Sequence, residues 1–189
     1  IGVIGGGAWG TTVGKLLSDK NSNVLLWAKE IQVKKDIEKT KINKTYLDKI
    51  KLNKSLKITN DLQDLSELDI LFVVIPTQYI QATLQPLKKI IKKNCILVNC
   101  AKGIDIKSTS LISEVINKTL PSNRLAIMSG PNFALEIALG KPTATLIAAQ
   151  KISDAKYIAN LISSKTFRPY LSSDIIGAQI CGAMKNVYA

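Results

Sequence analysis

The sequence predicts an α/β fold, a doubly wound and mostly parallel sheet with helices on both faces. Two observations predict it. Short apolar segments alternate along the chain with segments of helical spacing, and a glycine-rich turn joins the first such pair. Repeated strand–helix units imply parallel strands joined by helical crossovers. With 189 residues, of which 46% are hydrophobic, residues 1–189 are expected to form one domain with its own core.

The predicted strands are short apolar runs. The strongest is Asp69–Ile75, which is continuous and is followed at once by Pro76, a residue that interrupts a strand. In chain order, the predicted strands are 1–4, 24–28, 56–59, 69–75, 96–99, 125–128, 143–149 and 167–171.

The predicted helices occupy most of the intervening segments. The helix over 78–93 is amphipathic, with its apolar side chains spaced to share one face. The lysine-rich segment 40–57 has no clear period, and we expect a surface excursion there. The last helix begins near Asp174 and runs to the chain end without a capping signal, which indicates truncation. The predicted helices are 8–19, 30–39, 78–93, 111–118, 133–139, 152–163 and 174–189.

The glycine turn fits the pattern G-x-G-x-x-G and lies directly between a strand and a helix. Gly5 permits a tight turn, Gly7 lets the backbone approach a pyrophosphate, and Gly10 lets the helix pack on the strand. The helix N-terminus then offers free N–H groups to the phosphates. The turn therefore predicts a Rossmann-type site for NAD or NADP. A purely structural glycine turn is the alternative, and a Walker phosphate loop is excluded because Thr11 and Thr12 replace its Lys-Ser/Thr pair.

The end of the second strand usually separates NAD from NADP enzymes, because NAD enzymes place an acid there for the ribose hydroxyls. Here Lys29 comes first and could meet a 2′-phosphate, whereas Glu30 follows and could meet a ribose. Lys29 could equally be one more solvated lysine. The motif leaves the choice open, and Lys29 motivates the expectation that NADPH is accepted at least as well as NADH.

Composition narrows the function classes. The net charge is +12, but the lysines are scattered and only Arg124 and Arg168 are arginine, so we expect no nucleic-acid partner. The charge suits anionic cofactors and phosphorylated substrates instead. There is no histidine, so an acid–base group must be Lys, Tyr, Cys, Asp or Glu. The three cysteines fit no zinc pattern and are expected to be reduced and mostly buried.

The same composition bears on location. The apolar runs are far shorter than a membrane span, and no signal peptide is recognisable, so the cytoplasm is the expected compartment. The N-x-S/T triplets, which begin at Asn43, Asn53 and Asn117, carry no meaning in that compartment. A homodimer is the expected assembly.

Three further segments are candidate sites. The first two follow predicted strands, and the third lies in the last predicted helix. They are 99–103 with Lys102, 129–134 with Gly130 and Asn132, and 182–186 with Lys185. Each also has a plain structural interpretation as a loop lysine, a turn, or close helix packing. The short-chain dehydrogenase pattern Tyr-x-x-x-Lys is absent at every tyrosine.

Taken together, these segments resemble the bacterial-type NAD(P)-dependent glycerol-3-phosphate dehydrogenases, and the resemblance covers the whole chain. The most specific of them are S-G-P-x-F-A-x-E and G-A-x-K-N-V. The matching segments are Gly5 to Thr11, Leu26-Trp27, Tyr46-Leu47, Ala101 to Gly103, Ser129 to Glu136, Gly140 to Ala144 and Gly182 to Val187.

The resemblance implies a second, all-helical domain that completes the substrate site and is missing from this chain. It implies cofactor contacts at Ala8, Trp9, Lys29, Lys102 and Ala134, and substrate contacts at Lys102, Gly130 and Asn132. Asn132 departs from the Ser or Thr that many relatives have.

Lys185 matches the family's catalytic lysine. The implied reaction is reversible reduction of dihydroxyacetone phosphate to sn-glycerol 3-phosphate with NADH or NADPH, which supplies glycerophospholipid synthesis. The alternatives are another lysine-using hydroxyacid dehydrogenase of the superfamily and a non-catalytic dinucleotide-binding fragment.

Overall fold

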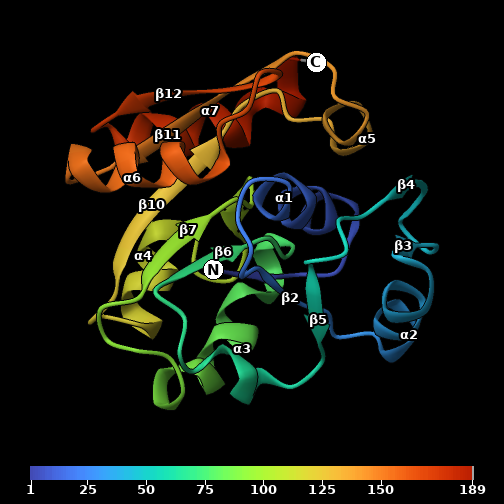
Figure 1. The fold of residues 1–189 in the computed structure, drawn as a ribbon. Coiled ribbons are helices and arrows are strands. Elements are labelled where there is room, and N and C mark those ends of the chain that lie inside the picture. The colour runs from blue at the N-terminus through green and yellow to red at the C-terminus, as the bar shows by residue number, and fades with distance from the viewer. Residues whose placement is uncertain (189) are drawn as a thin grey trace.

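The computed structural model describes residues 1–188, and side chains as far as Lys185. Its centre is an eight-stranded sheet with the strand order β12-β11-β10-β7-β6-β1-β2-β5 (Figure 1). All neighbouring strands are parallel except β10 and β11. The strands are β1 Gly2–Ile4, β2 Leu25–Trp27, β5 Lys57–Thr59, β6 Ile70–Val73, β7 Ile96–Asn99, β10 Arg124–Ser129, β11 Thr143–Ala149 and β12 Phe167–Ser172.

Helices cover both faces of this sheet, so the predicted doubly wound, mostly parallel fold is confirmed (Figure 1). On one side α1 contacts α5 and α6. On the other side α3 contacts α4, and Gln179 of α7 bonds to both the backbone N–H and the hydroxyl of Ser113 in α4. The helices are α1 Ala8–Ser18, α2 Ile31–Thr40, α3 Ile80–Leu84, α4 Ile112–Thr119, α5 Ala134–Ala138, α6 Ile152–Ile162 and α7 Ile175–Tyr188.

Apolar core clusters lie on both faces of the sheet, because successive side chains of a strand point to opposite sides. Phe72 of β6 is buried in the core that includes Val13 and Leu17 of α1. Its neighbours Leu71 and Val73 are buried in the other core with residues of α3 and α4. The central strands are therefore buried on both faces, which explains their continuous apolar sequence.

The strand order determines where a site can form. β1 lies between β2 and β6, and the chain turns one way from β1 to β2 and the other way when it enters β6. Ligands of open parallel sheets bind at such a switch point, outside the carboxyl ends of the strands. The segments that follow β1, β2, β6, β7 and β10 all lie at this one edge.

The one antiparallel pair of the central sheet follows the connection after β10. Residues 130–142 join β10 to β11 and contain α5, a helix of five residues. β11 then pairs antiparallel with β10.

The segment 40–57, predicted as a surface excursion, contains a hairpin that the sequence did not predict. Ile42–Asn43 and Leu47–Lys51 form an antiparallel hairpin, β3 and β4, in which Asn43, Leu47 and Ile50 are buried. The apolar positions are few and lie among lysines, so no window of the sequence shows a regular period. They are buried in one core cluster with residues of α1 and α2, two helices that precede this segment in the chain.

The helix predicted over 78–93 is buried on its expected face but is not one helix. Only Ile80–Leu84 is α-helical, and 3-10 turns occupy Thr77–Tyr79 and Gln85–Lys89. Pro86 lacks an N–H and disfavours helical geometry in the residue before it, which explains the change. A second small ladder, β8 Ile104–Asp105 with β9 Ser110–Leu111, was not predicted. None of the described helices is both long and apolar enough to cross a membrane.

Candidate functional site

The glycine turn after β1 has the geometry that its sequence predicts. Gly5 has φ +128°, in the region that favours glycine, and a Cβ there would collide with the Val74 carbonyl. A Cβ at Gly10 would collide with the Gly5 carbonyl, so α1 packs directly on the turn. A Cβ at Gly7 would meet no described atom within 4 Å. Gly5 and Gly10 thus serve the fold, whereas Gly7 leaves a space free.

The N-terminus of α1 faces that space. Gly7 is the N-cap, and the first turn contains the uncharged residues Ala8, Trp9 and Gly10. The first N–H groups of a helix have no partner within the helix, and the helix dipole makes this end partly positive. The arrangement is suited to an anion such as a pyrophosphate.

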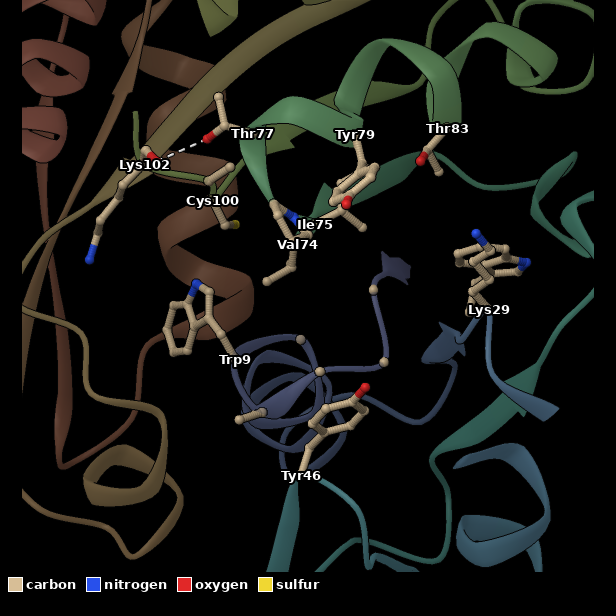
Figure 2. A pocket seen from close by; sticks show the side chains of 18 of the residues that line it. Trp9, Lys29, Tyr46, Val74, Ile75, Thr77, Tyr79, Thr83, Cys100 and Lys102 are labelled. Atoms are coloured by element: carbon tan, nitrogen blue, oxygen red, sulfur yellow. Dashed lines mark hydrogen bonds between the residues drawn. The ribbon is translucent and has the colours of Figure 1, made fainter. Parts of the chain in front are cut away.

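A cavity of about 750 Å³ opens in front of the turn. Figure 2 shows Trp9 and Tyr46 on one side of it, Tyr79 and Thr83 on the other, and Lys102 and Lys29 at its two ends. The predicted site residues that line it are Gly5, Gly7, Ala8, Trp9, Gly10, Lys29, Lys102 and Asn132. We call it the first cavity. Its volume suits a ligand of nucleotide size.

Two residues that line this cavity each have a buried polar atom without a partner. Among the described residues, Trp27 Nε1 and Asn132 Oδ1 are the buried side-chain atoms that make no hydrogen bond, and both residues line the first cavity. The Asn132 amide is oriented by its Nδ2, which donates to Thr145 Oγ1 at 3.1 Å. Buried polar groups are normally satisfied, so these two atoms are exceptions beside the cavity.

Lys102 is held at the boundary between β7 and β10. Its Nζ donates to the Gly130 carbonyl at 2.6 Å, and its own carbonyl accepts from Thr77 Oγ1 at 2.9 Å. Burial lowers the pKa of Lys102, and the nearby charge of Lys185 lowers it further. The two lysines are therefore electrostatic neighbours, although they lie 83 positions apart in the numbering.

Lys185 and Gly130 line a second, adjacent cavity of about 450 Å³. The Lys185 Nζ lies 4.2 Å from the centre of the Phe133 ring, a cation–π contact. Gly182 lets α7 approach this region, because a Cβ there would press on Ser129 Oγ and touch Lys102. The structure thus brings Lys102, Gly130 and Lys185 together. The side chains of Asn186 and Val187, at the end of the G-A-x-K-N-V motif, lie outside the described residues.

Ala134 lies outside both cavities. Its carbonyl accepts a hydrogen bond from Thr12 Oγ1 at 3.1 Å, so it ties α5 to α1. Its role in binding the cofactor stays a prediction, as do the roles of the other site residues.

Several lining residues were given no binding role from the sequence. They are Trp27, Tyr46, Val74 to Thr77, Tyr79 and Thr83. The segment after β6 could have been found, since it follows the strongest strand signal and lies at the carboxyl edge. Tyr46 was noted only as part of a segment that matches the family, because it reaches the cavity on the unexpected hairpin, where its hydroxyl lies 3.4 Å from Glu30 Oε1.

The three cysteines differ in exposure. Cys95 and Cys100 are buried and Cys181 is exposed, all as free thiols. Burial raises the pKa of Cys95 to about 12 and also raises that of Cys100, so both thiols are neutral. The described residues contain no group of three or more His, Cys, Asp or Glu side chains that could hold a metal.

A comparison with known families identifies what this arrangement is similar to. The model for the N-terminus of NAD-dependent glycerol-3-phosphate dehydrogenase matches residues 1–155. The chain is 38% identical over its whole length to a glycerol-3-phosphate dehydrogenase (NAD(P)+) of Parvibaculum lavamentivorans, of which it covers 57%. It is 39% identical to the protein of the same name from Paramagnetospirillum magneticum, of which it covers 69%. The chain thus spans a little over half of most relatives it matches.

Solved structures agree with this result. A crystal structure of glycerol-3-phosphate dehydrogenase from Coxiella burnetii superposes with a TM-score of 0.92 at 28% identity, over 98% of this chain and 57% of that one. The enzyme of Saccharomyces cerevisiae gives a TM-score of 0.90 at 28% identity, over 98% of this chain and 60% of that one.

Proposed function

We propose that this protein reduces dihydroxyacetone phosphate to sn-glycerol 3-phosphate. Its chain belongs, through its N-terminal domain, to the NAD-dependent glycerol-3-phosphate dehydrogenase family. The observation that supports this most is the meeting of two features at one edge of the sheet. A cavity with a helix N-terminus adjoins two lysines, Lys102 in its own wall and Lys185 in the wall of the second cavity. The first suits a dinucleotide, and the second suits a phosphorylated ketone.

The residues around the first cavity fit NAD or NADP. The free space at Gly7 and the N–H groups of Ala8 and Trp9 would hold the pyrophosphate. Lys29 and Glu30 would meet the adenosine ribose, at the end of β2. The chemistry that a bound nicotinamide supplies is hydride transfer.

The protein's own task is to bind the substrate and to move a proton. When C2 of the ketone gains a hydride, its oxygen gains an electron pair and needs a proton. Lys185, as an ammonium, would donate that proton and stabilise the developing charge. In the reverse direction, neutral Lys185 would accept the hydroxyl proton. Lys102, with Gly130 and Asn132, would hold the substrate beside it.

The direct test is an assay of the full-length protein with dihydroxyacetone phosphate and either NADH or NADPH. Oxidation of the cofactor that depends on this substrate supports the proposal. A panel of 2-keto acids serves as the comparison. Turnover of a keto acid but not of dihydroxyacetone phosphate would identify a different dehydrogenase, and cofactor binding without any turnover would identify a binding protein.

The proposal includes the organisation and surroundings of the protein. Residues 1–189 would be the cofactor domain, with α7 leading into a helical substrate domain. We propose the cytoplasm as its compartment, because its substrate is a phosphorylated metabolite and free buried thiols suit a reducing environment. A homodimer without nucleic acid is the proposed assembly, which analytical ultracentrifugation and a gel shift at varied salt would test.

A further inference from the structure

Asn43 is a fully buried polar residue that contacts the glycine turn. It lies on β3, with an exposed fraction of 0%. Its Nδ2 donates two hydrogen bonds, to the Gly6 carbonyl at 2.8 Å and to Thr11 Oγ1 at 2.7 Å. Its Oδ1 accepts from the backbone N–H of Tyr46 at 3.2 Å. Both the nitrogen and the oxygen of this amide are therefore hydrogen-bonded, to groups as far as 37 positions away in the sequence.

The first of these bonds sets the orientation of one peptide unit. Thr11 Oγ1 also donates to the Gly6 carbonyl, at 3.3 Å, so two donors hold that oxygen inside the protein. A trans peptide is planar, and its C=O and N–H point in opposite directions. When the Gly6 oxygen points inward, the Gly7 N–H must point outward, to the side where the first cavity lies.

This orientation matters because the opposite one would harm anion binding. Glycine has few steric limits, so the Gly6–Gly7 peptide can rotate more easily than one between larger residues. A rotated peptide would place a carbonyl oxygen, with its partial negative charge, toward the phosphate site. The Asn43 donor favours the orientation that presents an N–H instead.

Asn43 also orders the part of the cavity wall that contains Tyr46. Its third bond orders the turn of the hairpin, and that turn carries Tyr46. Tyr46 lines the first cavity beside Trp9 and approaches Glu30 at the end of β2 (Figure 2). One buried amide thus connects the glycine turn, α1 and the hairpin.

We propose that Asn43 is a positioning residue for the phosphate-binding turn, which keeps the Gly7 N–H directed at the anion and holds Tyr46 against the ligand. This inference rests on the proposed dinucleotide binding. Asparagine suits the task because its amide donates two bonds and accepts one. An aspartate of the same shape could only accept when ionised, and would repel both the Gly6 oxygen and a phosphate.

The test uses the full-length protein with Asn43→Ala and Asn43→Asp, and the ligands NADH and ADP-ribose measured by calorimetry. A hydrogen bond to a charged group accounts for a change in affinity of about tenfold or more. We expect Asn43→Ala to weaken both ligands by at least about tenfold and Asn43→Asp to weaken them more. Both ligands should lose affinity equally, because they share the pyrophosphate, and kcat at saturating cofactor should change little.

The matched control is Asn53→Ala. Asn53 belongs to the same connection, but its Oδ1 bonds only to Ser55, two residues away, and it does not line the cavity. This variant should bind both ligands like the wild type. A purely structural role for Asn43 would lower the melting temperature and leave the affinities of the folded protein unchanged, which would overturn the inference.

If Asn43→Ala does not fold, Thr11→Val decides. It keeps the shape of the side chain but removes the hydroxyl that bonds to both Asn43 and Gly6. We expect about threefold weaker binding of both ligands, and unchanged affinity would overturn the inference. Failure of the wild type to bind NADH or ADP-ribose would instead contradict the proposed function, so the two failures are distinguishable.

Discussion

The two cavities at the carboxyl edge of the sheet are built in different ways. In the first, the backbone of the glycine turn forms the end that is suited to a phosphate. The Gly5 N–H donates to the Trp27 carbonyl at 2.9 Å, and Asn43 holds the Gly6 carbonyl. The second is lined mostly by small residues, and Lys185 is the only lysine among the described residues that line it. Its Lys185 lies on Phe133, which is 55% exposed, and α7 presents a row of exposed apolar residues beside it, Ile176, Ile180 and Met184.

This difference suggests that the two cavities have different functions. Backbone groups held in place by neighbouring donors are suited to binding the same anion in every cycle, whereas a flexible lysine is suited to transferring a proton. Substitutions at the first cavity should therefore change cofactor affinity, and substitutions at the second should change turnover. Each of the following predictions tests this separation between cofactor affinity and turnover.

The largest expected effect is on turnover, from Lys185→Met in the full-length protein. Methionine keeps the length of the side chain but removes its charge and its proton. General acid catalysis contributes about 10²- to 10⁴-fold, and stabilisation of the alkoxide adds to it. We expect kcat to fall by at least about 10³-fold, with NADH affinity little changed, as steady-state kinetics and calorimetry would show.

A loss of less than about tenfold would contradict this assignment. Lys102 would then be the next candidate for the acid–base role, since it is the lysine nearest the same substrate position and its pKa is lowered. A large loss of NADH affinity in Lys185→Met would break the proposed separation of the two cavities.

The next effect is on binding, from Gly7→Val. Gly7 has φ −70°, which valine adopts without strain, and a Cβ there meets no described atom. The fold should therefore survive, while the side chain fills the space that the pyrophosphate needs. We expect NADH affinity to fall by more than about 100-fold, with a circular dichroism spectrum like that of the wild type.

Two other glycines serve as controls for this variant. Gly14→Ala adds a Cβ that would make ordinary contacts with Leu56, the nearest at 3.5 Å, so it should neither unfold the protein nor weaken binding. Gly10→Ala should destabilise the fold, because its Cβ collides with the Gly5 carbonyl. Unchanged NADH affinity in folded Gly7→Val would show that the cofactor does not pass over this turn.

The sequence predicted these two regions unequally, for a physical reason. Gly5, Gly7, Gly10 and Lys102 follow apolar strands, and local pattern alone places them at the carboxyl edge. Asn43 was given no structural role, because the two groups to which it donates are 32 and 37 positions away, and only the Tyr46 N–H is near it in the sequence. The antiparallel pairing of β11 with β10 likewise has no signal in local periodicity. Contacts between distant segments determine such features, so the features cannot be predicted from the periodicity of the sequence.

A smaller effect concerns cofactor choice. Lys29 is exposed at the end of β2, whereas Glu30 is close to the Tyr46 hydroxyl at 3.4 Å. We expect the full-length protein to use NADPH at least as well as NADH, because an ammonium can pair with the 2′-phosphate. Lys29→Asp should shift the ratio of kcat/KM values toward NADH by about tenfold, and Lys156→Met on α6 should leave the ratio unchanged. A wild type that strongly prefers NADH would refute the role given to Lys29.

The smallest expected effect is on the pKa of Lys102, and it measures the coupling between the two cavities directly. Burial is the main cause of the lowered pKa of Lys102, and the charge of Lys185 is the second. The folded chain therefore releases this proton at a lower pH than the unfolded chain. Between the folded pKa and the ordinary value near 10.5, the unfolded state binds more protons, so Lys102 makes the free energy of unfolding rise with pH.

Lys185→Met removes the second cause and leaves the first. The pKa of Lys102 should then rise without reaching its ordinary value, and the increase of stability with pH should become shallower. Side-chain NMR titration would follow the first change, and urea unfolding at a series of pH values would follow the second. Lys156→Met, which removes an exposed lysine on α6, should alter neither. If the pKa of Lys102 stays the same in Lys185→Met, the two ammonium groups do not interact, and the cavities are independent even where their walls meet.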